Sequence, residues 1–127
     1  MLKLLVAEDS EPFRMLYELN LDRGRFDIVF AANGQEAVSL FQSFKPDIIL
    51  LDLVMPVMSG AAALKEIRAQ EDGGARKTVI IMVTAMQPDD DMLESVKSAA
   101  DGYLLKPFKR NEINAVILKY FAQARHD

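Results

Sequence analysis

Short apolar segments alternate with longer amphipathic segments along the whole chain. Several of the apolar segments are rich in Val and Ile, and each is bounded by polar or turn residues, which is typical of buried β-strands. They are Leu2–Ala7, Phe26–Ala31, Asp47–Leu51, Thr78–Thr84 and Tyr103–Leu105. Because they are largely apolar throughout rather than at alternate positions, the pattern predicts a sheet that is covered on both faces.

The segments between these strands carry apolar residues at helical spacing. In the first of them, Ser10 can cap the N-terminus and Pro12 suits the first turn. The predicted helices run from Ser10 to Arg23, over Gln35–Phe44 and Ala61–Gln70, from Pro88 to about Ala100, and over Arg110–Gln123. Five strands that alternate with five helices predict one α/β domain over residues 1–127, a (βα)5 unit with a doubly wound parallel sheet.

Composition and charge narrow the classes of protein. The 127 residues include 15 Lys and Arg against 19 Asp and Glu, a net charge of −4, which argues against chain-wide electrostatic binding to nucleic acid. The absence of Cys excludes disulfides, Cys-zinc sites and thiol nucleophiles, and a single His at position 126 excludes a His-rich metal site. No segment has the length of a membrane span or of a secretory signal, so we expect a cytoplasmic protein that makes no membrane contact.

Charged and polar side chains gather where the predicted strands end. Glu8 and Asp9 follow the first strand, Asp52 follows the third, Thr84 ends the fourth and Lys106 follows the fifth. Ligands of open parallel sheets bind outside the carboxyl ends of the strands. We therefore expect three carboxylates, one hydroxyl and one ammonium group to meet at one rim of the sheet.

Most of these residues also have an ordinary structural interpretation. Asp9 can cap the following helix, and Glu8 can be a solvated loop residue. Thr84 can be a simple β-branched strand residue, and Lys106 a surface lysine. Asp52 directly follows four apolar residues, and a partly buried charge needs a partner or a metal. Three acids at one rim would raise one another's pKa values, and Mg²⁺ held by carboxylate oxygens would relieve that repulsion.

This set of side chains suits phosphoryl transfer. A carboxylate can act as a nucleophile and form an acyl phosphate, and the reaction needs little from the protein beyond charge neutralisation. Mg²⁺ and Lys106 would supply that charge, and Thr84 could donate a hydrogen bond to a phosphoryl oxygen. The small side chain of Ala85 would leave room for the incoming group.

Taken together, these residues resemble the receiver domain of two-component response regulators, of the kind found alone in chemotaxis regulators. The resemblance covers the chain from Lys3 to about Phe121. It is carried by Glu8-Asp9, by Asp52 followed by Met55-Pro56 and Gly60, by Thr84-Ala85, and by Gly102-Tyr103-Leu104-Leu105-Lys106-Pro107-Phe108. The resemblance implies a flavodoxin-like sheet with strand order 2-1-3-4-5.

The resemblance also implies a role for each site residue. Asp52 would be the phosphoacceptor, and Glu8, Asp9, Asp52 and the backbone carbonyl of Val54 would hold Mg²⁺. Thr84 and Lys106 would contact the phosphoryl group. The phosphate would come from a sensor histidine kinase or a phosphotransfer protein, and the chain would assist only its own phosphorylation and dephosphorylation, without being an enzyme for another substrate.

Further implications concern the change of state. The Lys106-Pro107 peptide bond would be cis, and Thr84 and Tyr103 would move on phosphorylation, although Tyr103 can equally be a half-exposed strand aromatic. The surface formed by the fourth helix, the fifth strand and the fifth helix would carry the signal to a downstream protein or output domain. The chain would act as a monomer or as a phosphorylation-induced homodimer, without contacting nucleic acid directly.

Three positions depart from the family pattern. Ser59 stands where many members have Asp, before the third helix. Val54 and Met86 are apolar where many members carry polar side chains, and both would flank the path of the water that hydrolyses the phosphoaspartate. We therefore expect slower self-dephosphorylation than in members with polar residues there.

Other functions fit the sequence less well. A haloacid-dehalogenase-type phosphatase would need a second Asp where Val54 stands, and neither dinucleotide- nor P-loop-type glycine motifs occur, which argues against a nucleotide or flavin carrier. A phosphorylation-independent interaction module on the same fold is the remaining alternative, and the intact acidic set with Lys106 argues against it.

Overall fold

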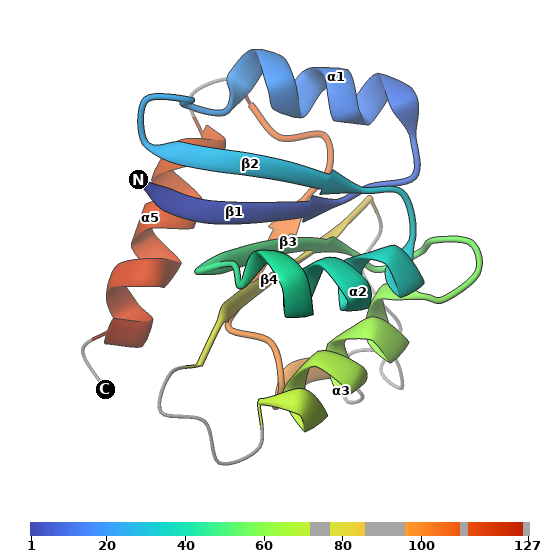
Figure 1. The fold of residues 1–127 in the computed structure, drawn as a ribbon. Coiled ribbons are helices and arrows are strands. Elements are labelled where there is room, and N and C mark those ends of the chain that lie inside the picture. Colours follow the sequence, from blue (N-terminus) through green and yellow to red (C-terminus); the bar gives the residue numbers. More distant parts are fainter. Residues whose placement is uncertain (72–76, 86–95, 110–111, 126–127) are drawn as a thin grey trace.

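The computed structural model describes residues 1–71, 77–85, 96–109 and 112–125. Within these ranges the strands are β1 (Leu2–Ala7), β2 (Phe26–Ala31), β3 (Ile48–Asp52), β4 (Val79–Thr84) and β5 (Gly102–Leu105). The helices are α1 (Glu11–Asn20), α2 (Gly34–Phe44), α3 (Gly60–Gln70) and α5 (Glu112–Arg125). From β1 to β4 strands and helices alternate along the chain, as the sequence pattern predicts, and α5 follows β5, whereas residues 86–95 between β4 and β5 lie outside the described ranges (Figure 1).

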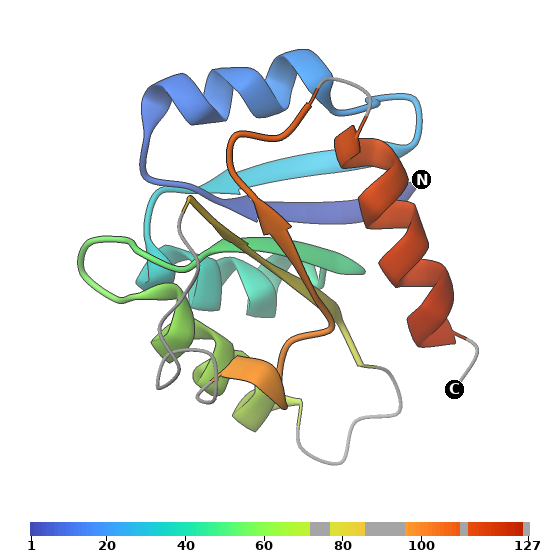
Figure 2. The same cartoon turned by 180° about the vertical axis from the view of Figure 1, so that it is seen from behind.

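The strands form one parallel sheet in the order β2-β1-β3-β4-β5, which confirms the predicted α/β class and strand order. Seen from behind, β5 lies at the edge of the sheet that is far from β2 (Figure 2). Because all strands run in the same direction, their carboxyl ends meet at one rim. The N-terminus lies at the opposite end of the sheet, on the left in Figure 1.

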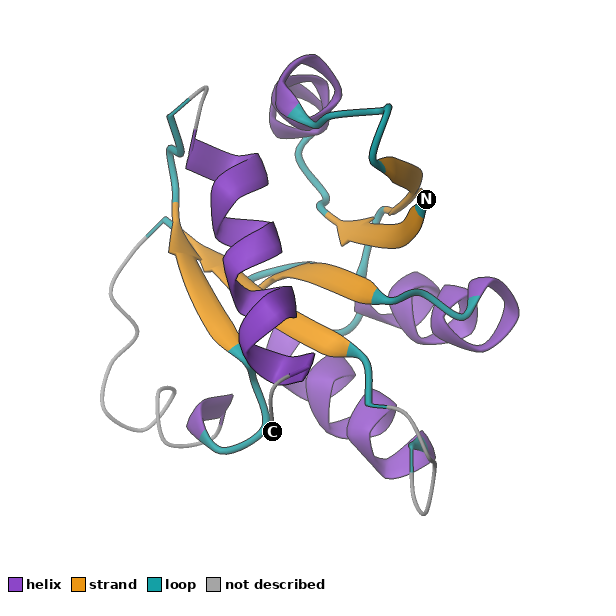
Figure 3. Cartoon of the chain, turned by 90° about the vertical axis from the view of Figure 1, so that its left-hand side faces the viewer, coloured by secondary structure: helices purple, strands orange, loops and turns teal. Residues whose placement is uncertain are grey.

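Two hydrophobic layers cover the two faces of the sheet. On one face α2 and α3 pack on residues such as Leu5, Ile49 and Ile80, and on the other α1 and α5 pack on residues such as Leu4 and Leu50. Figure 3 shows the helices on opposite sides of the strands. The central strand β3 is buried along its whole length. This double cover explains why the strand segments are apolar at consecutive positions.

The helix boundaries follow local capping signals. Ser10 caps α1 as predicted, since its Oγ accepts a hydrogen bond from the backbone N–H of Phe13 at 3.4 Å. Asn33 and Ser59 cap α2 and α3 in the same way. The first helix ends at Asn20 rather than at the predicted Arg23, because the backbone of Leu21 is already extended.

Of the predicted helix from Pro88 to about Ala100, residues 88–95 lie outside the described ranges, as does Met86, and residues 96–97 near its end are helical. The last predicted helix is present as α5 from Glu112, while residues 110–111 lie outside the described ranges. In the described part of the chain, every helix is too short or too polar to cross a lipid bilayer.

An ion-pair network closes the end of the sheet opposite the acidic rim. Arg68 of α3 donates hydrogen bonds to the carboxylates of Glu71 and Asp101, at 2.7 and 2.8 Å, and to the backbone carbonyls of Thr78 and Ala99, at 2.7 and 2.8 Å. The side chains of Arg68, Glu71 and Asp101 are 14%, 11% and 19% exposed. A single guanidinium group therefore joins the end of α3 to the start of β4 and to the segment before β5.

Candidate functional site

The topology brings the predicted site residues to the same rim. Glu8 and Asp9 directly follow β1, and Asp52 is the last residue of the neighbouring strand β3. Thr84 is the last residue of β4, and Lys106 follows β5. The backbone N–H of Lys106 donates a hydrogen bond to the carbonyl of Thr84 at 2.8 Å, which holds these two residues side by side.

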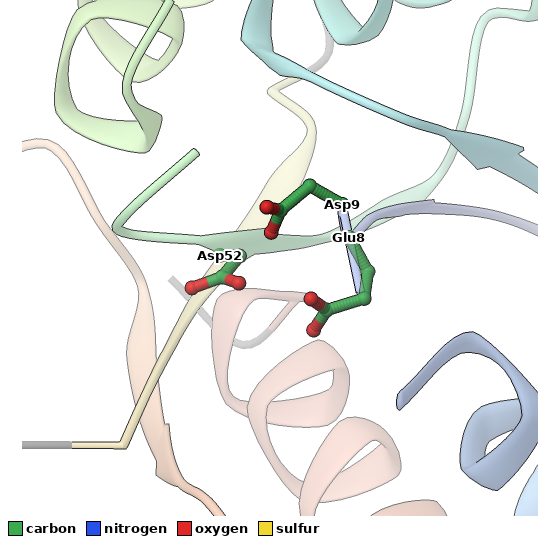
Figure 4. A group of neighbouring side chains, drawn as sticks. All are labelled: Glu8, Asp9 and Asp52. Carbon is green, nitrogen blue, oxygen red and sulfur yellow. The ribbon is translucent and has the colours of Figure 1, made fainter. Parts of the chain in front are cut away.

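The three acidic residues form a compact cluster. Each offers one carboxylate oxygen, and these atoms lie within 4.8 Å of one another. The carboxyl groups of Glu8, Asp9 and Asp52 point toward one another in Figure 4. Glu8 is 0% exposed and Asp52 is 6% exposed, whereas Asp9 is exposed to solvent. The site is thus buried on one side and open on the other.

Lys106 supplies a buried positive charge to this cluster. Its Nζ atom lies 2.6 Å from Oε1 of Glu8 and 2.9 Å from Oδ2 of Asp52. The contact with Asp52 is an aligned hydrogen bond, whereas the contact with Glu8 is an ion pair whose geometry leaves Oε1 without an aligned hydrogen-bond donor. One ammonium group faces three carboxylates, so the cluster keeps an excess of negative charge.

The pKa shifts follow from this burial. Burial raises the pKa of Glu8, and its contacts with the Lys106 ammonium and the Ser10 backbone N–H only partly oppose this shift. Burial alone would lower the pKa of Lys106, but its contacts with Glu8 and Asp52 outweigh that effect and the pKa is raised. The pKa of Tyr17, which is buried beneath the site, is raised by burial and by the charges of Glu8 and Asp52. Lys106 is therefore charged at neutral pH, while an ionised Glu8 is costly.

Main-chain contacts orient the carboxylates. The backbone N–H of Ser10 donates to Oε2 of Glu8 at 3.1 Å, and the backbone N–H of Val54 donates to Oδ1 of Asp52 at 3.3 Å. The guanidinium of Arg14 donates to the backbone carbonyl of Glu8 at 2.9 Å. A Cβ atom at Gly60 would overlap the carbonyl of Asp52, so only glycine lets α3 begin this close to β3.

The residues assigned to the change of state also lie near the rim. Thr84 is buried at the end of β4. Tyr103 of β5 is half-buried, and its hydroxyl oxygen is buried without a hydrogen-bond partner among the described residues. The Lys106-Pro107 peptide bond is cis. The segment from 86 to 95, which would form part of the predicted signalling surface, lies outside the described residues.

Sequence reasoning missed two neighbours of the site. Phe13 of α1 places its ring 4.2 Å from Nζ of Lys106, and Arg14 binds the carbonyl of Glu8. The sequence places Phe13 on the apolar face of its helix. This pattern predicts that the side chain is buried, but it does not identify the residue that the ring contacts.

The donor set fits a magnesium ion. Carboxylate oxygens are the ligands that this hard cation prefers, and the cluster offers one from each of three acids. The excess negative charge of three carboxylates around one ammonium group is what a divalent cation would relieve. Glu8, Asp9 and Asp52 are thus the side chains that would hold it.

The loop between β3 and α3 contains a strained residue. Val57 has a φ of 69°, in the left-handed region that β-branched residues avoid, and its side chain is 82% exposed. The left-handed conformation costs an L-residue about 1–2 kcal/mol, and glycine adopts it freely.

We expect Val57→Gly to stabilise the protein by about 1 kcal/mol, because relief of this strain exceeds the added entropy of the unfolded chain. Urea denaturation at neutral pH would measure the change. Val54→Gly is the matched control, since Val54 lies in the same loop, is also exposed and has no positive φ. Equal losses of stability in both variants would contradict the strain at Val57.

The fold and the rim define a class, namely parallel α/β domains that carry an acidic cluster and a lysine at the carboxyl ends of their strands. A family model described as the response regulator receiver domain matches residues 4–118. The chain belongs to this family, the receiver domains of two-component response regulators.

Two curated relatives illustrate the likeness. The chain is 38% identical over 112 residues to the chemotaxis protein CheY of Halobacterium salinarum, covering 87% of this chain and 89% of that protein. It is 34% identical over 113 residues to the alkaline phosphatase synthesis transcriptional regulatory protein PhoP of Bacillus subtilis, covering 89% of this chain. The chain spans about half the length of several such relatives, for example 45% of PhoP.

Solved structures agree with this assignment. Chemotaxis protein CheY4 of Vibrio cholerae superposes with a TM-score of 0.83 at 29% identity, over 94% of this chain and 98% of that one. The receiver domain of a Pseudomonas aeruginosa sensor histidine kinase also has a TM-score of 0.83, at 31% identity over 95% of this chain and 98% of that one. That structure holds a magnesium ion in its active-site cleft.

Proposed function

We propose that this chain is a phosphorylation-dependent signalling switch whose phosphoacceptor is Asp52. The observation that carries the proposal is the buried Asp52 carboxylate, which lies beside two further acids and 2.9 Å from the ammonium of Lys106. A carboxylate nucleophile with a fixed cation and a divalent-metal site beside it is suited to phosphoryl transfer.

In the proposed reaction, a carboxylate oxygen of Asp52 forms a bond to the phosphorus atom of a phosphohistidine. The P–N bond breaks, and the donor imidazole keeps the electron pair. A magnesium ion held by Glu8, Asp9, Asp52 and the Val54 carbonyl would offset the negative charge of the carboxylates and of the phosphoryl oxygens. Water later hydrolyses the acyl phosphate, which regenerates the carboxylate and releases inorganic phosphate. The chain thus assists only its own modification.

Lys106 and Thr84 would bind the phosphoryl group. Lys106 is already charged and buried beside Asp52, so it can exchange its carboxylate contact for a phosphoryl oxygen. Thr84 is held next to Lys106 by the backbone hydrogen bond between them. A Thr hydroxyl at the end of β4 can donate a hydrogen bond to a second phosphoryl oxygen.

Tyr103 would report the change of state. Its buried hydroxyl has no hydrogen-bond partner among the described residues, so a rotation of the ring can bring it to a new partner. A small energy difference between two ring positions lets a charge change at the site shift the population. The altered surface would then be recognised by a downstream protein or an output domain.

The phosphodonor would be a histidine kinase or a phosphotransfer protein that docks on α1. The outer face of this helix exposes Met15, Leu16 and Leu19, which are 57%, 39% and 76% exposed. Exposed apolar residues that follow one helix face favour contact with another helix. Helix α1 begins shortly after Glu8 and Asp9, so its exposed apolar face starts near the acidic cluster and extends along the helix away from it.

Incubation with acetyl phosphate, followed by intact mass measurement, tests the proposal. We expect one added phosphoryl group in the presence of Mg²⁺ and none after removal of divalent cations with EDTA. Beryllofluoride binding, followed by NMR, serves as a second readout. If neither modification occurs with Mg²⁺, the phosphorylation-independent interaction module becomes the better interpretation.

The exposed apolar side chain at position 54 predicts a long-lived phosphoaspartate. Val54 is 62% exposed beside Asp52 and cannot orient an attacking water molecule. We expect Val54→Asn, which adds hydrogen-bonding groups at that position, to shorten the phosphate lifetime roughly threefold, a barrier change of under about 1 kcal/mol. Loss of phosphate measured by mass over time would check it, and an unchanged or longer lifetime would count against the idea.

A further inference from the structure

The Lys106 ammonium has a third described neighbour besides its two carboxylate partners. The ring of Phe13 lies 4.2 Å from Nζ, measured to the ring centroid. This is well within the distance of about 6 Å at which an aromatic face attracts a cation. The Lys106 side chain is only 7% exposed, so water competes little with the ring for the charge.

Phe13 is held in a defined position relative to the acidic cluster. It lies in the first turn of α1, and its backbone N–H donates to the Oγ of Ser10. The backbone N–H of Ser10 in turn donates to Oε2 of Glu8. Two consecutive hydrogen bonds therefore connect the backbone of Phe13 to a carboxylate of the site.

The same helix face also holds the segment that carries Lys106. Tyr17, one turn after Phe13, packs on Phe108 with ring centroids 5.0 Å apart. Helix α1 thus contacts this segment on both sides of Pro107, through the ammonium of Lys106 and through the ring of Phe108. Aromatic contact at two points restricts how far Lys106 can move.

The ring differs from the two carboxylates in one chemical respect. Glu8 and Asp52 are also the groups that a metal and a phosphoryl group would engage, so Lys106 would share these partners once the site is loaded. A neutral aromatic ring binds neither Mg²⁺ nor phosphate, and its contact with the ammonium survives both events.

We infer that Phe13 is a positioning residue, whose ring holds the Lys106 ammonium beside Asp52 when the carboxylates engage metal and phosphoryl group. The inference rests on the proposed function and adds a residue from α1 to the site. It predicts that the ring matters for the rate of phosphoryl transfer rather than for the folding of the domain or for metal binding.

Phosphorylation by acetyl phosphate at saturating Mg²⁺ tests the inference. We expect Phe13→Leu to slow the reaction roughly fivefold to tenfold, with a Mg²⁺ affinity within about twofold of the unaltered chain; tenfold corresponds to about 1.4 kcal/mol. Phe13→Tyr and Phe13→Trp, which keep an aromatic face, should restore the rate to within about twofold. Phe44→Leu is the matched control, because Lys3 lies 5.4 Å from that ring, away from the rim, and its rate should be unchanged.

An NMR measurement distinguishes a role of Phe13 in positioning the Lys106 ammonium from a role in packing alone. Protons on the Lys106 ε-carbon should resonate upfield of those of exposed lysines because of the ring current. They should stay upfield when Mg²⁺ is added, and they should move to the ordinary position in Phe13→Leu.

An unchanged phosphorylation rate in a folded Phe13→Leu variant would overturn the inference while the proposed function stands. Failure of the aromatic variants to restore the rate would also overturn it. If the unaltered chain takes up no phosphate, the proposed function fails, and the inference fails with it.

Discussion

The Asp52→Asn chain is expected to take up no phosphate from acetyl phosphate under conditions in which the unaltered chain gains one phosphoryl group. An amide oxygen is a far poorer nucleophile than a carboxylate, and the substitution also removes one of the three acidic ligands of the metal. Because the side chains are nearly the same size, the buried site at the end of β3 remains filled. Intact mass after a fixed incubation would measure the difference.

Two control variants keep this prediction specific. Asp27→Asn makes the same chemical change at an exposed position of β2 and should leave phosphorylation unaltered. Asp9→Asn removes the exposed acid of the cluster and should raise the Mg²⁺ concentration needed for half-maximal phosphorylation without abolishing the reaction. Phosphate that still appears on the Asp52→Asn chain would place the acceptor elsewhere.

The largest expected loss of stability comes from Arg68→Met. The substitution would leave the mostly buried carboxylates of Glu71 and Asp101 without their cation, and two backbone carbonyls without their donor. Removing one partner of a buried ion pair typically costs about 3–5 kcal/mol, a large part of the stability of a single domain, which is about 5–15 kcal/mol. Urea denaturation at 25 °C would show the loss as a lower transition midpoint.

Arg25→Met is the matched control for that measurement. Arg25 forms an ion pair with Asp22 at 3.3 Å, but the two side chains are 60% and 45% exposed, and such pairs contribute little. We expect this control to change the free energy of unfolding by less than about 1 kcal/mol. Comparable losses in both arginine variants would mean that the Arg68 network adds no more than a surface ion pair does.

Sequence reasoning recovered the fold because its signals are local. The strand segments differ from the structure by at most one residue at either end, as at Asp47 and Gly102, since their apolar runs are sharply bounded. The end of α1 was placed too late because a contact that is distant in sequence holds the chain after it. The side chain of Asn114 in α5 accepts a hydrogen bond from the backbone of Asp22, 92 residues earlier.

The sequence identified the residues of the site, but it did not predict the distances between their side chains. Parallel strands bring their ends together, so Glu8, Asp52 and Lys106 could be placed at one rim from strand order alone. Their pairing distances depend on side-chain packing across the sheet. The same holds for the Arg68 network, whose partners lie 3 to 33 residues away without a repeating spacing. The left-handed backbone conformation of Val57 could not be predicted from the sequence either, because valine rarely adopts that conformation.

The order of the strands also bears on how the chain folds as it leaves the ribosome. Strand β1 pairs with β2 and β3, so residues up to Asp52 complete one side of the sheet, from the edge strand β2 to the central strand β3. After β3, each new strand adds to the open edge beside the strand that precedes it, without passing between strands already paired. The domain can thus grow outward from its N-terminal part as synthesis proceeds, and the acidic rim gains its lysine only when Lys106 has emerged.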